Sequence, residues 1–226
     1  MIRAFFIADL LIAFAYPLDW WTGGVYWKIT ALVDPRAPDN LVRWYASMQL
    51  SLVAFLGAMF VRAKFDWRVW ASWLLLALPA IFVVLSFEQV GEIHEWLRYR
   101  MGHVLPTGFF AKNALYLRDV TILGGLLVTV VLIGVRYSAR PDPRREGHIA
   151  TKYAIGFVLL VGGPSGIEAL SPFLSHATPF RVAQLAAEAL VELVGITCTL
   201  WATRDVFVAH GLSSPLIASP QGDPPA

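Results

Sequence analysis

The feature that most constrains the fold of this chain is a series of apolar runs, each about 20 residues long. An α-helix needs a run of about this length to cross the hydrocarbon core of a bilayer. The composition agrees, because 57% of the 226 residues are hydrophobic and 15% are charged, whereas soluble domains carry about 25% charged residues. We therefore expect an all-α integral membrane protein with the lipid bilayer as its surroundings.

We expect six transmembrane helices, packed as a bundle in one domain that covers residues 1–212. The spans are 3–19, 44–62, 69–89, 119–136, 152–172 and 182–205. Residues 213–226 form a Pro-rich tail with the composition of a disordered segment. The first run is a retained span and not a signal peptide, because Asp9 interrupts its apolar core and no small-residue cleavage site follows.

Glycine and proline predict where these helices end. Gly23–Gly24 should end the first helix, and together with Pro35 and Pro38 they should break any helix in the segment before the second span. Pro79 should kink the third span. The sequence Gly162–Gly163–Pro164 should break the fifth span before Glu168. Residues 136–152 are expected to form a polar connector broken by its prolines.

The distribution of Lys and Arg predicts the orientation of the chain in the membrane. The connector 136–152 carries five basic residues and the turn 62–68 carries three, whereas the loop 172–182 carries only Arg181. With six spans, this places both termini in the cytoplasm of a bacterial inner membrane.

Several function classes find no support in the sequence. The net charge is +2 and no basic, aromatic-interleaved patch occurs, so we expect no nucleic-acid partner. The single cysteine, Cys198, excludes a disulfide framework within the chain. No two histidines lie at mid-membrane on different helices, so we expect no haem. No hydrolase motif of the Gly-x-Ser-x-Gly or His-Glu-x-x-His type is present, and an enzymatic activity stays open.

The stretch SFEQVGEIHEWLRYRMG, residues 86–102, continues the third apolar run and adds charge where that run should leave the membrane. Glu88, Glu92 and Glu95 follow helical spacing and form one acidic stripe, and His94 can approach it from the flank. Ionisable residues at membrane depth are costly and mark a functional site by default.

Antiparallel threading should bring further carboxylates to the same leaflet. The third and fifth spans end there with Glu88 and Glu168. The sixth span starts there, so Glu188 and Glu192 lie about 9 and 15 Å below its outer end. Four glutamates from three helices should therefore occupy the outer half of the membrane.

A polar stripe along the sixth span strengthens this expectation. Its members recur about every four residues and should face the bundle interior: Gln184, Glu188, Glu192, Gly195, Thr199 and Thr203. Like charges one turn apart repel, so at least one of the two glutamates should be protonated unless a cation lies between them.

Three interpretations of the acidic cluster compete. In the first, a divalent Fe, Mn or Zn ion is bound, with these residues as ligands: Glu88, His94, Glu95, Glu168, Glu188 and Glu192. The Glu-x-x-His pair of di-iron bundles is absent, because Gly91 stands three residues before His94. In the second, the acids relay protons or cations. In the third they are structural: Glu95 pairs with Arg98, and protonated Glu188 and Glu192 bond to backbone carbonyls. Asp9 either joins the site, bonds to a Ser or Thr, or snorkels.

The run SFEQVGEIHE followed about a hundred residues later by EALVELVG resembles a pattern of uncharacterised bacterial polytopic membrane proteins. Their pattern is a helix ending in Ser-x-Asp/Glu and Ile-His-Glu, with a later helix that carries Glu-x-x-x-Glu. Here Phe87–Glu88–Gln89 stands where the pattern has an Asp–Glu pair. The resemblance implies one composite site formed by both helices and implies no activity.

The expected function is that of a small membrane protein whose outward-facing Glu/His cluster binds a metal ion or relays protons. The alternative is a non-catalytic accessory subunit of a larger energy-transducing complex, respiratory or photosynthetic. Other membrane subunits would then dock on the uncharged span 119–136, through Gly124–Gly125, and on the C-terminal tail.

Overall fold

The computed structural model describes residues 1–24, 27–35, 37, 40–68, 70–91, 143–170 and 178–209. Within these ranges the chain is helical and has no strand, so the all-α prediction is confirmed. The helices are α1 (Ile2–Trp21), α2 (Trp27–Val33), α3 (Leu41–Lys64), α4 (Trp70–Gly91), α7 (Pro143–Phe157), the π-helical turn η1 (Val158–Gly162), α8 (Gly163–Leu170) and α9 (Thr178–Ala209).

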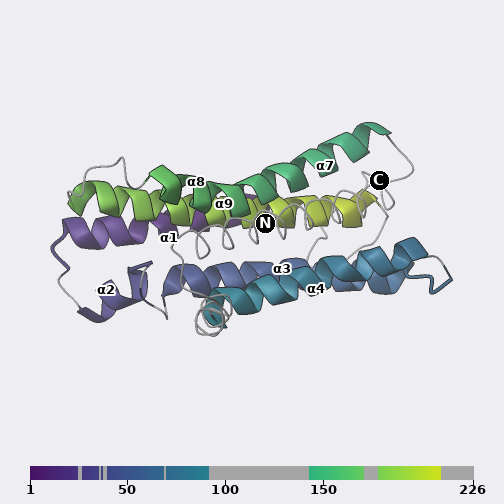
Figure 1. Cartoon of the computed structure of the whole chain (residues 1–226), viewed down its shortest axis with the longest axis horizontal. Coiled ribbons are helices and arrows are strands. Elements are labelled where there is room, and N and C mark those ends of the chain that lie inside the picture. The colour runs from purple at the N-terminus through teal and green to yellow at the C-terminus, as the bar shows by residue number, and fades with distance from the viewer. Residues whose placement is uncertain are drawn as a thin grey trace, which may run out of the picture.

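The long helices lie side by side along the longest axis of the molecule (Figure 1). α3 and α4 form one antiparallel pair, while α7, η1 and α8 follow one another along α9. α9 is the central helix, because α1, α3, α7, η1 and α8 all pack against it. Its interior-facing residues Leu193, Ile196 and Leu200 are fully buried in the main hydrophobic core.

Two described helices are long and apolar enough to cross a membrane, Leu41–Lys64 and Pro179–Ala209. Leu76–Phe87 and His148–Gly162 are shorter apolar helical segments. The expected span 119–136 and the tail 213–226 lie outside the described residues. The six-span bundle and its division into one domain and a tail therefore stay predictions.

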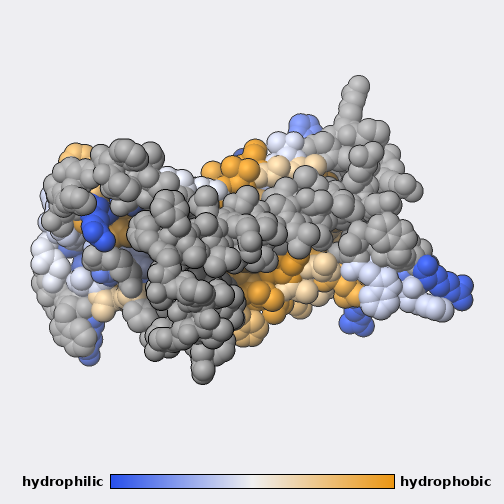
Figure 2. Space-filling model, viewed as in Figure 1, coloured by the Kyte–Doolittle hydropathy of each residue, from blue (hydrophilic) through white to orange (hydrophobic). Residues whose placement is uncertain are grey.

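Large apolar side chains cover much of the outer surface. Seven of them on α1 are more than two-fifths exposed: Ile7, Leu10, Leu11, Phe14, Leu18, Trp20 and Trp21. Figure 2 shows apolar residues over the middle of the visible face and hydrophilic ones at its two ends. Soluble proteins seldom expose large apolar patches, whereas a bundle in lipid is expected to do so.

The helix does not break at Gly162–Gly163–Pro164, and that prediction is wrong. The chain remains helical because η1 widens the backbone into a π turn and α8 begins directly after it. Pro164 is the second residue of α8 and has no N–H to donate to the preceding turn, and the widened π turn directly before it accommodates the proline. Pro143 likewise begins α7, so the expected connector 136–152 is helical from this residue onward.

The predicted end of the first helix is confirmed, whereas the expectation that no helix forms between it and the second span is wrong, because α2 lies there. Gly23 and Gly24 have φ angles of 87° and 60°, and glycine adopts this left-handed region without a steric penalty. At the other end of the α2 segment, the buried Asn40 caps α3 by accepting a hydrogen bond from the Arg43 N–H at 2.9 Å. Its side-chain amide donates to the carbonyl of Ala37 at 2.6 Å.

Hydroxyl groups and a glycine hold α3 against α4. Ser86 on α4 shares hydrogen bonds with the hydroxyls of Ser47 at 2.9 Å and Ser51 at 2.8 Å. Further along, a Cβ on Gly57 would lie 3.5 Å from the Pro79 side chain, so the two helices approach closely at the proline. Pro79 therefore packs against α3 at a position where α3 has no side chain.

A close contact between backbones joins the α7–η1 segment to α9 through two glycines. A Cβ on Gly195 would lie 2.6 Å from the backbone nitrogen of Leu160 and 2.8 Å from the carbonyl oxygen of Gly156. A Cβ on Gly156 would lie 2.9 Å from the carbonyl oxygen of Gly195. Backbone atoms cannot rotate away from such a clash, so both positions require glycine.

Gly195→Ala should therefore lower the free energy of unfolding by about 1–3 kcal/mol, because the added methyl group overpacks a contact between backbones. The matched control is Gly166→Ala in α8, where an added Cβ meets nothing within 4 Å. Thermal unfolding of the detergent-purified proteins measures both effects. Equal midpoints for Gly195→Ala and Gly166→Ala would contradict this account of the helix packing.

Candidate functional site

The structure describes the side chains of Glu188 and Glu192, the two glutamates of α9. Glu88 lies in α4 and Glu168 in α8, and their side chains are outside what the structure describes. His94 and Glu95 also lie outside the described residues. The complete set of metal ligands therefore stays a prediction.

Each of the two glutamates on α9 is bonded to a glutamine amide. Gln89, next to Glu88 at the end of α4, donates from its Nε2 to Glu192 Oε1. Gln184, one turn before Glu188, donates from its Nε2 to Glu188 Oε1 at 2.8 Å. These amides orient the carboxyl groups without neutralising them. The sequence analysis included Gln184 in the stripe but gave Gln89 no role.

Charged neighbours act on this pair of glutamates. The Glu188 carboxyl and the Arg43 guanidinium, near the start of α3, both interact electrostatically with Glu192. Glu192 is partly buried. The end of the bundle formed by α3, α4 and α9 therefore combines two carboxyl groups, two amides and one cation.

The polar stripe continues along α9 into the core, as predicted. Gly195, Thr199 and Thr203 are buried. Thr199 donates to the Gly195 carbonyl at 3.0 Å and Thr203 to the Thr199 carbonyl at 2.9 Å. The Thr203 hydroxyl also bonds to that of Tyr153 on α7 at 2.8 Å. From residue 184 to residue 203 the stripe extends for about 28 Å along the helix axis.

The stripe ends at an ion pair between α7 and α9. Lys152 pairs with Asp205, and both side chains are about one-quarter exposed. The Lys152 ammonium also lies 4.0 Å from the centre of the Trp201 ring, within the range of a cation–π interaction. Opposite ends of α9 therefore carry different ionisable groups, carboxyls at one end and a neutralised pair at the other.

A second polar group lies on another face of α9, around Asp9. Asp9 is fully buried, so of the three alternatives for this residue snorkelling is wrong. Its Oδ1 accepts a hydrogen bond from Gln49 Nε2 at 2.8 Å, and the same nitrogen donates to Thr197 Oγ1 at 3.1 Å. The sequence analysis missed Gln49, whose only signal is an amide within an otherwise apolar span.

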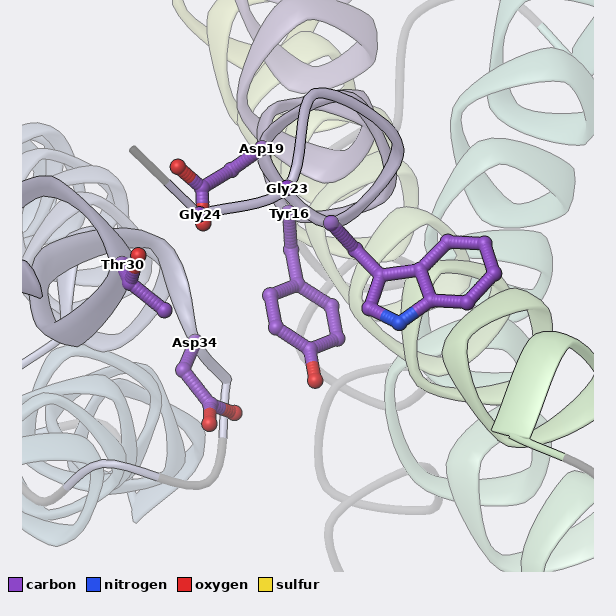
Figure 3. Close-up of a pocket in the computed structure, with 7 residues that line it drawn as sticks. Tyr16, Asp19, Gly23, Gly24, Thr30 and Asp34 are labelled. Carbon is purple, nitrogen blue, oxygen red and sulfur yellow. The ribbon is translucent and has the colours of Figure 1, made fainter. Parts of the chain in front are cut away.

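A hollow of about 290 Å³ lies where α1 ends and α2 begins. Figure 3 shows Asp19, Thr30 and Asp34 on one side of it and the Tyr16 ring facing them. Tyr16 packs against Val182 and Leu185 at the start of α9. An acidic and aromatic hollow therefore lies close to the end of α9 that carries Gln184 and Glu188.

Within the described residues, no group of three or more His, Cys, Asp and Glu side chains is arranged to hold a metal ion. No family model matches the sequence, and no curated protein and no solved structure matches it.

The hydrogen bond between Gln89 and Glu192 can be tested by a double-mutant cycle. Gln89→Leu and Glu192→Leu should show a coupling energy of about 1–3 kcal/mol in unfolding experiments, because residues in direct contact are not additive. The control cycle pairs Gln184→Leu with Glu192→Leu, since Gln184 bonds to Glu188 instead. Additive effects in the first cycle would contradict the contact.

Proposed function

We propose that this chain is an integral membrane protein that relays protons through carboxyl groups inside its helical bundle. The observation that carries the proposal is the pair Glu188 and Glu192 on the polar stripe of α9, which are bonded to the amides of Gln184 on the same helix and of Gln89 on α4. Carboxyl groups inside a membrane bundle commonly serve ion pathways and proton relays. The relay would be centred on these two glutamates, which lie one turn apart on α9.

Proton relay is favoured over metal binding by the hydrogen-bonding partners. The Gln89 and Gln184 amides donate to carboxylate oxygens that a metal ion would otherwise use. A proton moves between such oxygens and water without displacing the amides. The alternative is that a divalent Fe, Mn or Zn ion is bound by the full set of six predicted ligands, and the elemental analysis below tests it.

The hollow at the end of α1 supports an entry point for protons at the end of the bundle that carries Glu188. Asp19 and Asp34 line it, and carboxylates at the mouth of a path attract cations from water. Tyr16 connects its wall to the first turns of α9. Protons would therefore reach Glu188 from the end of the bundle and not from the lipid-facing side.

Glu192→Gln should abolish or strongly reduce proton flux, because glutamine keeps the shape and hydrogen bonds of the side chain but does not carry a proton. The measurement is acidification of vesicles that contain the purified protein and a trapped pH-sensitive dye, with a potassium gradient and valinomycin as the driving force. Asp66→Asn is the control, since Asp66 lies in the exposed turn between α3 and α4.

Two results would contradict the relay. Flux that is equal in wild type and Glu192→Gln, with equal thermal stability, would indicate a structural role for the acid. Elemental analysis separates the third case: stoichiometric Fe, Mn or Zn in the wild type, and its loss in Glu192→Gln, would replace the relay by a metal site.

Membrane insertion and orientation form a separate prediction. The exposed apolar side chains of α1 should keep the protein in the membrane fraction after extraction with alkaline carbonate. In bacterial cells, a C-terminal fluorescent protein should be active and a C-terminal alkaline phosphatase inactive, because both termini are proposed to lie in the cytoplasm. Release by carbonate would refute the insertion, and the opposite reporter pattern would refute the orientation.

A further inference from the structure

The buried group around Asp9 contains three oxygen atoms that lack a hydrogen-bond partner in the described part of the chain: Asp9 Oδ2, Gln49 Oε1 and Tyr45 Oη. Asp9 and Gln49 are both fully buried. Buried polar atoms in folded proteins are almost always paired, and an exception requires an explanation. Three such atoms on neighbouring side chains indicate one shared cause.

The orientation of the Gln49 amide group follows from the two hydrogen bonds that it donates. Its Nε2 donates to Asp9 Oδ1 at 2.8 Å and to Thr197 Oγ1 at 3.1 Å. Reversing the amide would place its oxygen against the carboxylate, which offers only acceptors when it is ionised. Gln49 Oε1 therefore points away from those two partners and remains available as a ligand.

Tyr45 completes the group from the same helix, one turn before Gln49. Its hydroxyl lies within short-range reach of the side chains of both Asp9 and Gln49, although neither contact has the full geometry of a hydrogen bond. A proton on Asp9 is the alternative to a cation at this position, and the binding experiment below separates the two.

The charge of the group selects the kind of particle. Asp9 is the one carboxyl group among these side chains, and no ion pair to it is formed by a described Lys, Arg or His. Lys152 pairs with Asp205 instead. One buried carboxylate is balanced by one positive charge. Carboxylate, amide and hydroxyl oxygens are hard ligands, which suit hard cations and not thiophilic transition metals.

We infer that Asp9, Tyr45, Gln49 and Thr197 form a binding site for a monovalent hard cation of the Na⁺ class, between α1, α3 and α9. Asp9 Oδ2, Gln49 Oε1 and Tyr45 Oη bind the ion, and Thr197 positions Gln49 by accepting its second hydrogen bond. The site lies on a different face of α9 from Glu192 and does not depend on the proposed proton relay.

The test is thermal unfolding of the full-length protein in detergent, at constant pH and ionic strength, in NaCl, KCl or choline chloride. A ligand that binds only the folded state raises its stability in a saturable way. We expect Na⁺ to raise the melting temperature over choline by several degrees, and K⁺ to raise it less. The same melting temperature in all three salts would overturn the inference.

Two variants of similar shape locate the effect. Tyr45→Phe removes one ligand oxygen and should weaken the apparent Na⁺ affinity by about tenfold, whereas Tyr153→Phe removes a buried hydroxyl from the Thr203 contact and should leave the affinity unchanged. Asp9→Asn should abolish the Na⁺ response. An unchanged Na⁺ response in Asp9→Asn would overturn the site.

If Asp9→Asn fails to fold, direct measurement of Na⁺ binding to the wild type and to Tyr45→Phe still tests the inference. Radioactive ²²Na⁺ should bind the wild-type protein and be displaced by unlabelled Na⁺, and Tyr45→Phe should bind it more weakly. If the wild type binds no ²²Na⁺ and its melting temperature responds only to pH, Asp9 holds a proton and the inference is wrong. Loss of proton flux in Glu192→Gln with intact ²²Na⁺ binding would support both proposals separately.

Discussion

The close backbone contact between the α7–η1 segment and α9 is the constraint on which the rest of the bundle depends. Gly156 and Gly195 leave no side chain between the two helices, so each helix packs directly on the backbone of the other. In lipid, packing of small residues is what holds helices together, because the hydrophobic effect between them is absent. The π turn at Val158–Gly162 brings the Leu160 backbone into the same contact.

Tight packing excludes water, and it therefore requires that interior polar groups find partners inside the protein. Thr199 and Thr203 meet this requirement by bonding to carbonyl groups of their own helix. Tyr153 meets it across the interface with Thr203. Asp9 meets it only in part, through Gln49, and this incomplete pairing distinguishes its surroundings from the rest of the core.

Length and local composition predicted an all-helical chain, because an apolar run acts over neighbouring residues, but they did not predict α2 or the start of α7 at Pro143. Gly23–Gly24 ended α1 as expected, whereas Gly162–Gly163–Pro164 did not end a helix, since a π turn accommodated the proline at the start of α8. The interior position of Thr199 and Thr203 followed from helical spacing alone. The partner of Asp9 could not be predicted, because Gln49 is 40 residues away and no local pattern links the two. The same holds for Gln89 and Glu192, which are 103 residues apart.

Three faces of α9 carry three different contacts, and together they fix its rotation. At about 100° per residue, Gly195 lies about 60° to one side of Glu192, and Thr197 lies about 140° to the other side. Glu192 faces α4, Gly195 faces the α7–η1 segment and Thr197 faces Gln49 on α3. Rotating α9 to improve one contact would break another. The glycine contact tolerates the least displacement of α9, because backbone meets backbone there. It therefore sets the geometry of the carboxyl pair and of the Asp9 group together, although the two groups share no side chain.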